Sequence, residues 1–220
     1  MTNPQSSDWN NFWVNQETNK LKKPSWSKQR IIKVIEPYLQ KKKKVLDAGC
    51  GSGFFSKYFC DQGMKVVSLD YADTALEMTE KMTLGRARII KRDLLQEDLA
   101  ATLGEKFDII FSDGLLEHFT SADQNKIMKN FISVLSPSGI LITFVPNRWS
   151  PWELIRPLFM PGIDETPFVL RGLVRLNTCN GLSVLQTGGI NTFPFFFSPD
   201  QLFGRFFGML LYTIAEKNVP

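Results

Sequence analysis

Hydrophobic positions in the first two thirds of the chain alternate between short continuous runs and runs with a helical period. Continuous apolar runs at residues 44–48, 64–69, 107–111 and 140–145, with a shorter one at 88–90, are typical of strands buried on both faces. The segments between them place apolar side chains three or four positions apart, as amphipathic helices do. This alternation predicts five parallel strands joined by crossover helices.

The last third of the chain has a different pattern, because prolines interrupt residues 147–167. Beyond them we expect a helix over 168–180, a strand over 182–190 and a last strand over 209–216. The last two strands, if paired, add an antiparallel edge. The predicted fold class is α/β: a Rossmann-like, doubly wound sheet of seven strands, mostly parallel with an antiparallel C-terminal edge strand, and helices on both faces.

A chain of 220 residues is expected to form one domain. Within residues 1–220 we expect a core at 30–146, preceded by an aromatic cap segment at 1–29. An insertion with a helix, a strand and a phenylalanine-rich acceptor or cap region is expected at 147–208, followed by the last strand at 209–220.

Composition narrows the class of protein. With 43% hydrophobic residues the chain can bury a core, and a net charge of +4 is too small to indicate nucleic acid. One histidine and three cysteines do not supply the ligand sets of structural zinc sites, so no metal is expected. The odd cysteine count and the polar start of the chain predict a cytoplasmic protein, and no apolar run is long enough to span a membrane.

Three glycines follow the first strand. Gly49, Gly51 and Gly53 let the backbone turn sharply and approach a ligand closely, and the helix that follows offers free N–H groups. A nucleotide-like ligand is expected there. The dinucleotide fingerprint would need a glycine at Phe54, which disfavours NAD, and no Gly-Lys-Ser or Gly-Lys-Thr follows to make a P-loop.

The segment Asp47-Ala48-Gly49-Cys50-Gly51-Ser52-Gly53 follows the pattern D-x-G-x-G-x-G and resembles the class I S-adenosylmethionine-dependent methyltransferases, in particular their broad type 11 small-molecule branch. The resemblance extends to Asp70 after the second strand, Asp93 after the third, and the strand 107–110. It ends with the turn at 135–141 and covers about residues 30–146. It implies S-adenosylmethionine as the cofactor and S-adenosylhomocysteine as the product.

The resemblance assigns the nucleoside half of the cofactor to four positions after the second and third strands. Asp70 would accept both ribose hydroxyls, Tyr71 would lie against the adenine, and Asp93 with Leu94 would lie beside the adenine amino group. Each has a structural alternative, since a carboxylate at a strand end can cap a helix or close a turn and a tyrosine can simply lie at the surface.

The amino-acid half is assigned to the loops after the first and fourth strands. Buried Asp47 should be held by loop N–H groups or, through water, by the ligand's ammonium group. Ser112 and Gly114 could offer backbone carbonyls, and the neighbouring Asp113 is either a site residue or only a turn residue. Cys50 is expected as a small cofactor-contacting side chain and not as a nucleophile.

The acceptor side is less defined. His118 could take a proton from a hydroxyl or amine, although a lone histidine is often a packed or capping residue, and Glu117 is a weaker candidate base. Aromatic residues in three flanking segments are expected to cap an apolar acceptor pocket, or else to form ordinary core or a homodimer face. They are Trp9, Phe12, Trp13, Trp26, Trp149, Trp152, Phe159, Phe193, Phe195, Phe196, Phe197, Phe203, Phe206 and Phe207, together with Met160.

The sequence thus predicts methyl transfer from S-adenosylmethionine to oxygen, nitrogen or carbon of a small, apolar or aromatic molecule. Motifs of DNA methyltransferases are missing after the fourth strand, where Ser112-Asp113-Gly114-Leu115 stands, so no DNA partner is expected. Three alternatives stay open: a non-catalytic cofactor-binding module with a protein partner, a methyltransferase acting on protein or RNA, and a nicotinamide oxidoreductase.

Overall fold

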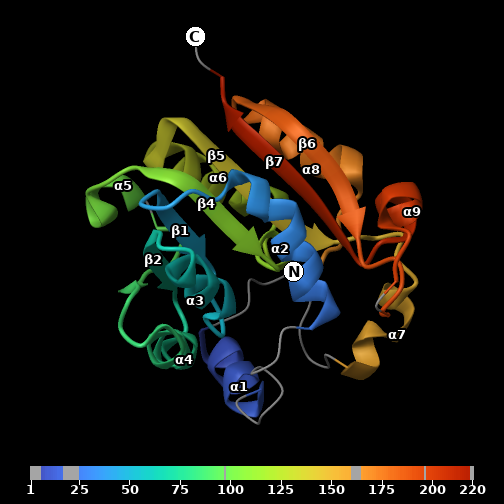
Figure 1. Cartoon of the computed structure of the whole chain (residues 1–220), viewed down its shortest axis with the longest axis horizontal. Helices are drawn as coiled ribbons and strands as arrows, with labels where there is room; N and C mark the ends of the chain where they lie inside the picture. Colours follow the sequence, from blue (N-terminus) through green and yellow to red (C-terminus); the bar gives the residue numbers. More distant parts are fainter. Residues whose placement is uncertain (1–5, 17–24, 97, 160–164, 196, 219–220) are drawn as a thin grey trace.

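The computed structural model describes residues 6–16, 25–96, 98–159, 165–195 and 197–218 (Figure 1). Seven strands form one sheet in the order β3-β2-β1-β4-β5-β7-β6. The strands are β1 (Lys44–Ala48), β2 (Lys65–Asp70), β3 (Arg88–Lys91), β4 (Phe107–Asp113), β5 (Leu135–Pro146), β6 (Leu182–Ile190) and β7 (Leu210–Lys217). β7 runs antiparallel to both of its neighbours, and the pairs from β3 to β5 are parallel. The predicted seven-stranded, mostly parallel sheet is confirmed.

Helices cover both faces of this sheet. They are α1 (Ser6–Gln16), α2 (Trp26–Ile35), α3 (Phe54–Asp61), α4 (Asp73–Thr83), α5 (Leu99–Leu103), α6 (Ser121–Val134), α7 (Trp152–Phe159), α8 (Leu170–Cys179) and α9 (Asp200–Phe207), with the short 3-10 turns η1 (Glu36–Tyr38) and η2 (Leu116–His118). No helix within the described ranges is long and apolar enough to cross a bilayer.

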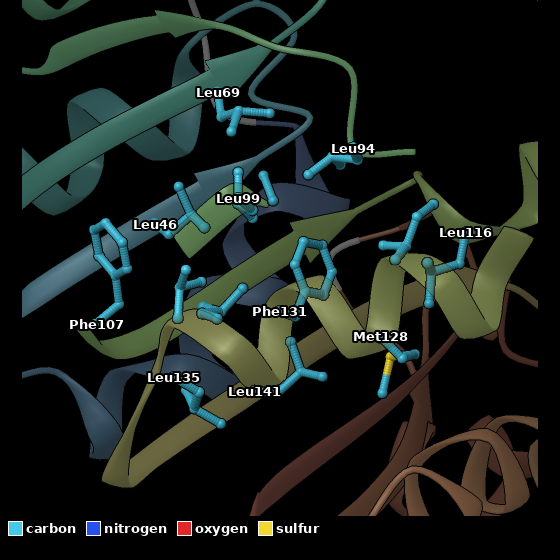
Figure 2. Packing of buried hydrophobic residues seen from close by; sticks show 14 of the residues in the cluster. Leu46, Leu69, Leu94, Leu99, Phe107, Leu116, Met128, Phe131, Leu135 and Leu141 are labelled. Carbon is cyan, nitrogen blue, oxygen red and sulfur yellow. The ribbon is translucent and has the colours of Figure 1, made fainter. Parts of the chain in front are cut away.

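Two apolar cores lie between the helices and the sheet. On one face, α5 and α6 pack against β1, β4 and β5, and α8 packs against β6 and β7. Figure 2 shows Phe131 and Met128 of α6 among the strand residues Leu46 and Leu141. On the other face, α2 and α3 pack through residues such as Phe59, which is fully buried. The continuous apolar strands are explained by this double coverage.

The structure differs from the predicted elements in particular places. The antiparallel C-terminal strand lies one place in from the edge, because β7 inserts between β5 and β6. β5 begins at Leu135, so the expected turn at 136–139 belongs to the strand. Helices α1, α7 and α9 form in segments for which no helix was predicted.

The sheet brings the ends of distant strands together. β1 lies between β2 and β4, with Asp47 in register with Ser68 of β2 and with Phe111 of β4. Because the parallel strands end at the same edge, the residues that follow β1, β2 and β4 meet there. The predicted site residues lie at this edge.

Candidate active site

A cavity of about 840 Å³ lies at the carboxyl ends of β1, β2, β4 and β5. Ligands bind at this edge in open α/β sheets. Most of the predicted site residues line the cavity, namely Asp47, Gly49, Cys50, Gly51, Asp70, Tyr71, Asp93, Leu94, Gly114 and His118. Gly53 and Ser112 do not line it. Residues chosen from the sequence therefore do lie around one cavity. Gly53 and Ser112 have other positions in the structure, which are described below.

The glycine loop is held against the end of β2. The N–H groups of Gly49 and Cys50 both donate to the carbonyl of Leu69, at 2.8 and 3.1 Å. Gly51 has a φ of +51°, in the left-handed region that favours glycine. Gly53 also has positive φ, and a Cβ there would lie 2.5 Å from the Cα of Thr79. Gly53 thus allows close packing of α3 against α4 and does not contact the ligand space.

Asp70 ends β2 with its carboxylate almost fully buried. One oxygen accepts a hydrogen bond from the Gly51 N–H at 3.1 Å, and the other accepts from the N–H groups of Tyr71 at 2.8 Å and Ala72 at 3.0 Å. Burial raises the pKa of this carboxyl, and the three backbone donors act in the opposite direction. The side chain is fixed at the cavity wall. Its two oxygens can accept further hydrogen bonds, including those from a ligand.

Asp47 is held by the first turn of α3. Its Oδ2 accepts a hydrogen bond from the Ser56 hydroxyl at 2.5 Å, and a backbone hydrogen bond from Ser56 also acts on this carboxylate. That hydroxyl also lies 2.7 Å from the hydroxyl of Ser68. Burial, with added charge repulsion from Asp113 and Asp70, raises the pKa of Asp47 to about 7, although the hydrogen bond from Ser56 acts in the opposite direction. A nearby cationic ligand group would favour its charged form.

The expected adenine side is formed by the ends of β2 and β3. Tyr71, Asp93 and Leu94 all line the cavity, and Leu94 is buried. Asp93 also accepts a hydrogen bond from the Leu95 N–H at 2.8 Å, which shapes the loop after β3. The position of Asp93 therefore agrees with both interpretations of this residue, as a ligand contact and as a residue that forms the turn.

The end of β4 adds a charged pair. Asp113 lines the cavity, and burial raises its pKa to about 6, while the charge of Lys28 has the opposite effect. Lys28 comes from α2, and its Nζ lies 4.2 Å from the ring centre of Phe54. Burial lowers the pKa of Lys28. Ser112, one residue earlier on β4, is completely buried and faces away from this space.

The part of the cavity wall formed by η2 holds a histidine among carboxylates. His118 Nε2 lies 4.0 Å from Oε1 of Glu117, and both side chains are almost fully buried. Glu165 also lines the cavity, and burial raises the pKa of Glu117 well above its usual range, with further repulsion from Glu165 and Asp113. The imidazole lies edge to face with Trp9 at 4.7 Å between ring centres. This wall offers groups that can hold or move a proton.

Aromatic side chains from α1 and α7 close the cavity. Trp9, Phe12, Trp13 and Trp152 line it, as the cap hypothesis expects of them. A Cβ at Gly51 would lie 2.6 Å from the Trp13 ring, so this ring lies directly on the glycine loop. The Thr74 N–H donates to Asn10 at 3.1 Å and joins α1 to α4.

Other members of the predicted aromatic cap lie away from the cavity. Exposed aromatic residues that do not line it are Trp26, Trp149, Phe193, Phe195, Phe197, Phe203, Phe206 and Phe207. The side chains of Phe159, Met160 and Phe196 lie outside the described part of the chain. α9, which carries several of these phenylalanines, contacts β6 and not the glycine loop (Figure 1).

Comparison with known proteins identifies the domain. Residues 45–139 match the family model described as a methyltransferase domain. A ubiquinone biosynthesis O-methyltransferase of Histophilus somni is 32% identical over 120 residues, which cover 51% of this chain and 49% of the relative. The matched residues, 45–139, are those of a class I S-adenosylmethionine-dependent methyltransferase domain. The chain's match spans about half the length of that curated relative.

More distant relatives match the methyltransferase domain over a larger share of the chain. A probable S-adenosylmethionine-dependent methyltransferase of Mycolicibacterium smegmatis is 27% identical over 178 residues, 79% of this chain and 59% of the relative. The 1,6-didemethyltoxoflavin-N1-methyltransferase of Burkholderia thailandensis, solved with its substrate and S-adenosylhomocysteine, superposes with a TM-score of 0.69 at 17% identity. That likeness covers 97% of this chain and 87% of the other and shows a shared fold.

Several residues that line the cavity of the methyltransferase domain escaped the sequence analysis. They are Lys28, Arg92, Leu95, Phe119, Glu153, Arg156, Glu165 and Met209. Arg156 joins two of them, with Nε 3.2 Å from Glu153 and Nη1 3.5 Å from Glu165. Glu153 and Arg156 are three residues apart, and this spacing predicts an ion pair if the segment is helical. Nothing local in the sequence indicated that this pair reaches the cavity.

Proposed function

We propose that the protein transfers the methyl group of S-adenosylmethionine to an oxygen of a small, apolar or aromatic molecule. The observation that carries this proposal is that the glycine loop, Asp70 and His118 with its neighbouring aromatic rings all line one shared cavity. Ligand pockets for one drug-sized molecule are about 300–1,000 Å³. A cavity of about 840 Å³ has room for the cofactor and a small acceptor.

The residues present fit the cofactor. In this proposal Asp70 accepts the ribose hydroxyls, Tyr71 lies against the adenine, and Asp93 with Leu94 lies at the adenine edge. Gly49, Cys50, Gly51 and Gly114 contact the amino-acid half, and Asp47 faces its ammonium group. The raised pKa of Asp47 supports this role, because a buried carboxyl near neutrality gains a charged partner when a cation binds. Gly53 and Ser112 position the loops and have no direct contact.

Methyl transfer from a sulfonium is an in-line displacement: the acceptor oxygen forms a bond to the methyl carbon while the carbon–sulfur bond breaks. An enclosed site accelerates this step by holding the two atoms about 3–3.5 Å apart and excluding water. The cap residues Trp9, Trp13 and Trp152 provide that enclosure. We assign His118 to the acceptor hydroxyl, whose proton must leave as the oxygen–carbon bond forms.

Oxygen as the methylated atom is supported by the curated relatives of Histophilus somni and of two Bartonella species, which are O-methyltransferases. The apolar lining supports an aromatic acceptor. The acidic residues around His118 disfavour a nucleic-acid acceptor, since phosphates would face Glu117, Glu153 and Glu165.

Calorimetric titration with S-adenosylmethionine, S-adenosylhomocysteine and NADH tests the cofactor. We expect micromolar binding of the two sulfur ligands and none of NADH. A screen of hydroxylated aromatic molecules for release of S-adenosylhomocysteine then tests turnover. Cofactor binding without turnover on any acceptor would favour a non-catalytic module, and binding of NADH alone would overturn the proposal.

A further inference from the structure

Three metal-binding groups meet on the acceptor side of the cavity. Glu117 and His118 belong to η2, which follows β4, and Glu165 comes from the segment between α7 and α8. One donor atom from each side chain can be chosen such that the three atoms lie within 4.8 Å of one another. Two carboxylate oxygens and one imidazole nitrogen form a donor set that divalent cations accept.

Glu117 gives an independent sign that something is bound there. Its side chain is 2% exposed, and Oε2 has no hydrogen-bond partner among the described residues. A buried carboxylate without a partner is costly, so such groups are normally paired or coordinate a metal. The other oxygen, Oε1, is 4.0 Å from His118 Nε2, which is longer than a hydrogen bond.

Arg156 is a cation on this wall, and it binds two of the neighbouring carboxylates. It contacts Glu153 at 3.2 Å and Glu165 at 3.5 Å. Asp113 adds a further negative group whose charge acts on Glu117. Carboxylates thus outnumber the cation along this part of the wall, and a bound divalent cation would offset the excess.

We propose that Glu117, His118 and Glu165 bind a divalent metal cation that in turn holds an oxygen of the acceptor. The mixture of one nitrogen and two oxygen donors suits Mn²⁺ or Zn²⁺ better than Ca²⁺, which takes oxygen ligands only. Three protein ligands leave coordination positions free, as in catalytic metal sites. Because all three residues line the cavity, these positions face the ligand space.

The metal site adds a detail to the proposed function. It rests on that function only in one respect, namely that the oxygen bound to the cation belongs to the acceptor. A metal ion lowers the pKa of a bound hydroxyl, so the acceptor would release its proton to solvent water when it binds the cation. In this arrangement His118 is a ligand of the cation, and this role replaces direct acceptance of the proton by its imidazole. The acceptor class is correspondingly a hydroxylated aromatic molecule, with a phenol or two adjacent oxygens that a cation can hold.

Binding of Mn²⁺ to the full chain tests the site without any methyl transfer. The chain is freed of metal with a chelator and titrated with Mn²⁺, and the electron paramagnetic resonance signal of free Mn²⁺ reports binding. We expect one ion per chain. Loss of supporting groups around metals typically weakens binding about 10–100-fold. We therefore expect at least a tenfold weaker affinity in Glu117→Gln, and the same in Glu165→Gln, which removes a ligand from a different segment.

Glu77→Gln is the matched control, because it removes one negative charge from an exposed position on α4. It should bind Mn²⁺ like the parent. Circular dichroism checks that each variant is folded, and the same titration with Zn²⁺ in competition tests the preference for nitrogen-containing sites. Absence of Mn²⁺ and Zn²⁺ binding by the folded parent, or equal binding by all variants, would overturn the proposal.

The two proposals can fail separately. Mn²⁺ binding that depends on Glu117 and Glu165, with no S-adenosylhomocysteine released from any acceptor, would leave the metal site and reject the methyltransferase activity. Turnover that continues at full rate in the presence of a chelator, with no metal bound, would reject the metal site and leave the activity.

Discussion

The carboxylate of Asp70 accepts a hydrogen bond from the backbone N–H of Gly51 at 3.1 Å, which joins the end of β2 to the glycine loop after β1. The acid and the loop are therefore positioned together. With Tyr71 and Ala72 also donating to this carboxylate, its orientation is fixed before a ligand arrives. Such preorganisation lowers the entropy cost of binding.

We predict that Asp70→Ala weakens binding of S-adenosylmethionine by about 1.5–3 kcal/mol, the range for hydrogen bonds to a charged group. The loss combines the missing ribose contacts and a less ordered glycine loop. Calorimetric titration measures it. Asp73→Ala is the control, because Asp73 lies three residues away, is exposed and pairs with Lys91. An unchanged affinity in folded Asp70→Ala would reject the assignment.

How far the fold follows from the sequence depends on how local each signal is. Strand β1 and strand β6 have the predicted bounds, because apolar runs and the glycines beside them are local features. The insertion of β7 between β5 and β6 is a matter of pairing between distant segments, which periodicity does not encode. α1, α7 and α9 were missed because their aromatic residues mask a helical period and prolines interrupt the segment around α7.

The site was predictable where it follows strands directly. The resemblance assigned Asp47 and Asp70, and the strand geometry agrees with it, because residues at the ends of neighbouring parallel strands lie at one edge of the sheet. Lys28 of α2 and Glu165 beyond α7 reach the same cavity only through tertiary packing. The adjacent pair Glu117 and His118 was visible in the sequence, but its partner Glu165, 47 residues farther along, was not.

His118→Ala should abolish most turnover and leave cofactor binding unchanged, since His118 lies on the acceptor side of the cavity. Loss of a group that acts on the acceptor proton typically costs about 10²–10⁴-fold in rate. Release of S-adenosylhomocysteine measures turnover, and calorimetry measures the cofactor affinity. If His118→Ala catalysed the reaction at the parent rate, the role of His118 would be limited to packing against Trp9.

Trp13→Ala should weaken cofactor binding by about 1–3 kcal/mol, because the ring lies on Gly51 and its loss opens the cavity to water. The free energy of unfolding should change less, since Trp13 is only partly buried on the first helix. Titration and urea unfolding give the two quantities. Val14→Ala, on the same helix but exposed, serves as the control. Equal affinity in Trp13→Ala and Val14→Ala would contradict a capping role for α1.

Stability without ligand should fall as the pH rises from about 5 to 8. Burial raises the pKa of Asp47 to about 7, above its unfolded value of 3.8, so the folded state holds the proton more tightly. That contribution is complete below the unfolded pKa and is lost as the pH rises through about 7. Asp113, whose pKa is raised to about 6, acts in the same direction.

Asp47→Asn removes this titration. Its melting temperature should therefore decline less than that of the parent between pH 5 and pH 8, which scanning calorimetry measures on ligand-free protein. Asp73→Asn, an exposed position, should follow the parent curve. Parallel curves for Asp47→Asn and the parent would mean that Asp47 titrates alike in the folded and unfolded states.

The contact between α9 and β6 depends on two glycines. A Cβ on Gly204 would lie 1.9 Å from the carbonyl oxygen of Gly189, so helix and strand touch through their backbones. Gly204→Ala should lower the free energy of unfolding by about 1–3 kcal/mol, the usual cost of overpacking. Gly172→Ala on α8 is the matched control, because its new Cβ would meet Val169 at an ordinary 3.5 Å.

At Gly172 the intrinsic preference of a helix for alanine should dominate and raise the free energy of unfolding by about 0.5–1 kcal/mol. Urea unfolding of both variants separates the two effects, because the same exchange of glycine for alanine then has opposite signs at the two positions. Cofactor affinity should be unchanged in both, since Gly172 and Gly204 lie away from the cavity. If Gly204→Ala were as stable as the parent, α9 could move away from β6 without cost, and its exposed phenylalanines would not be fixed by this contact.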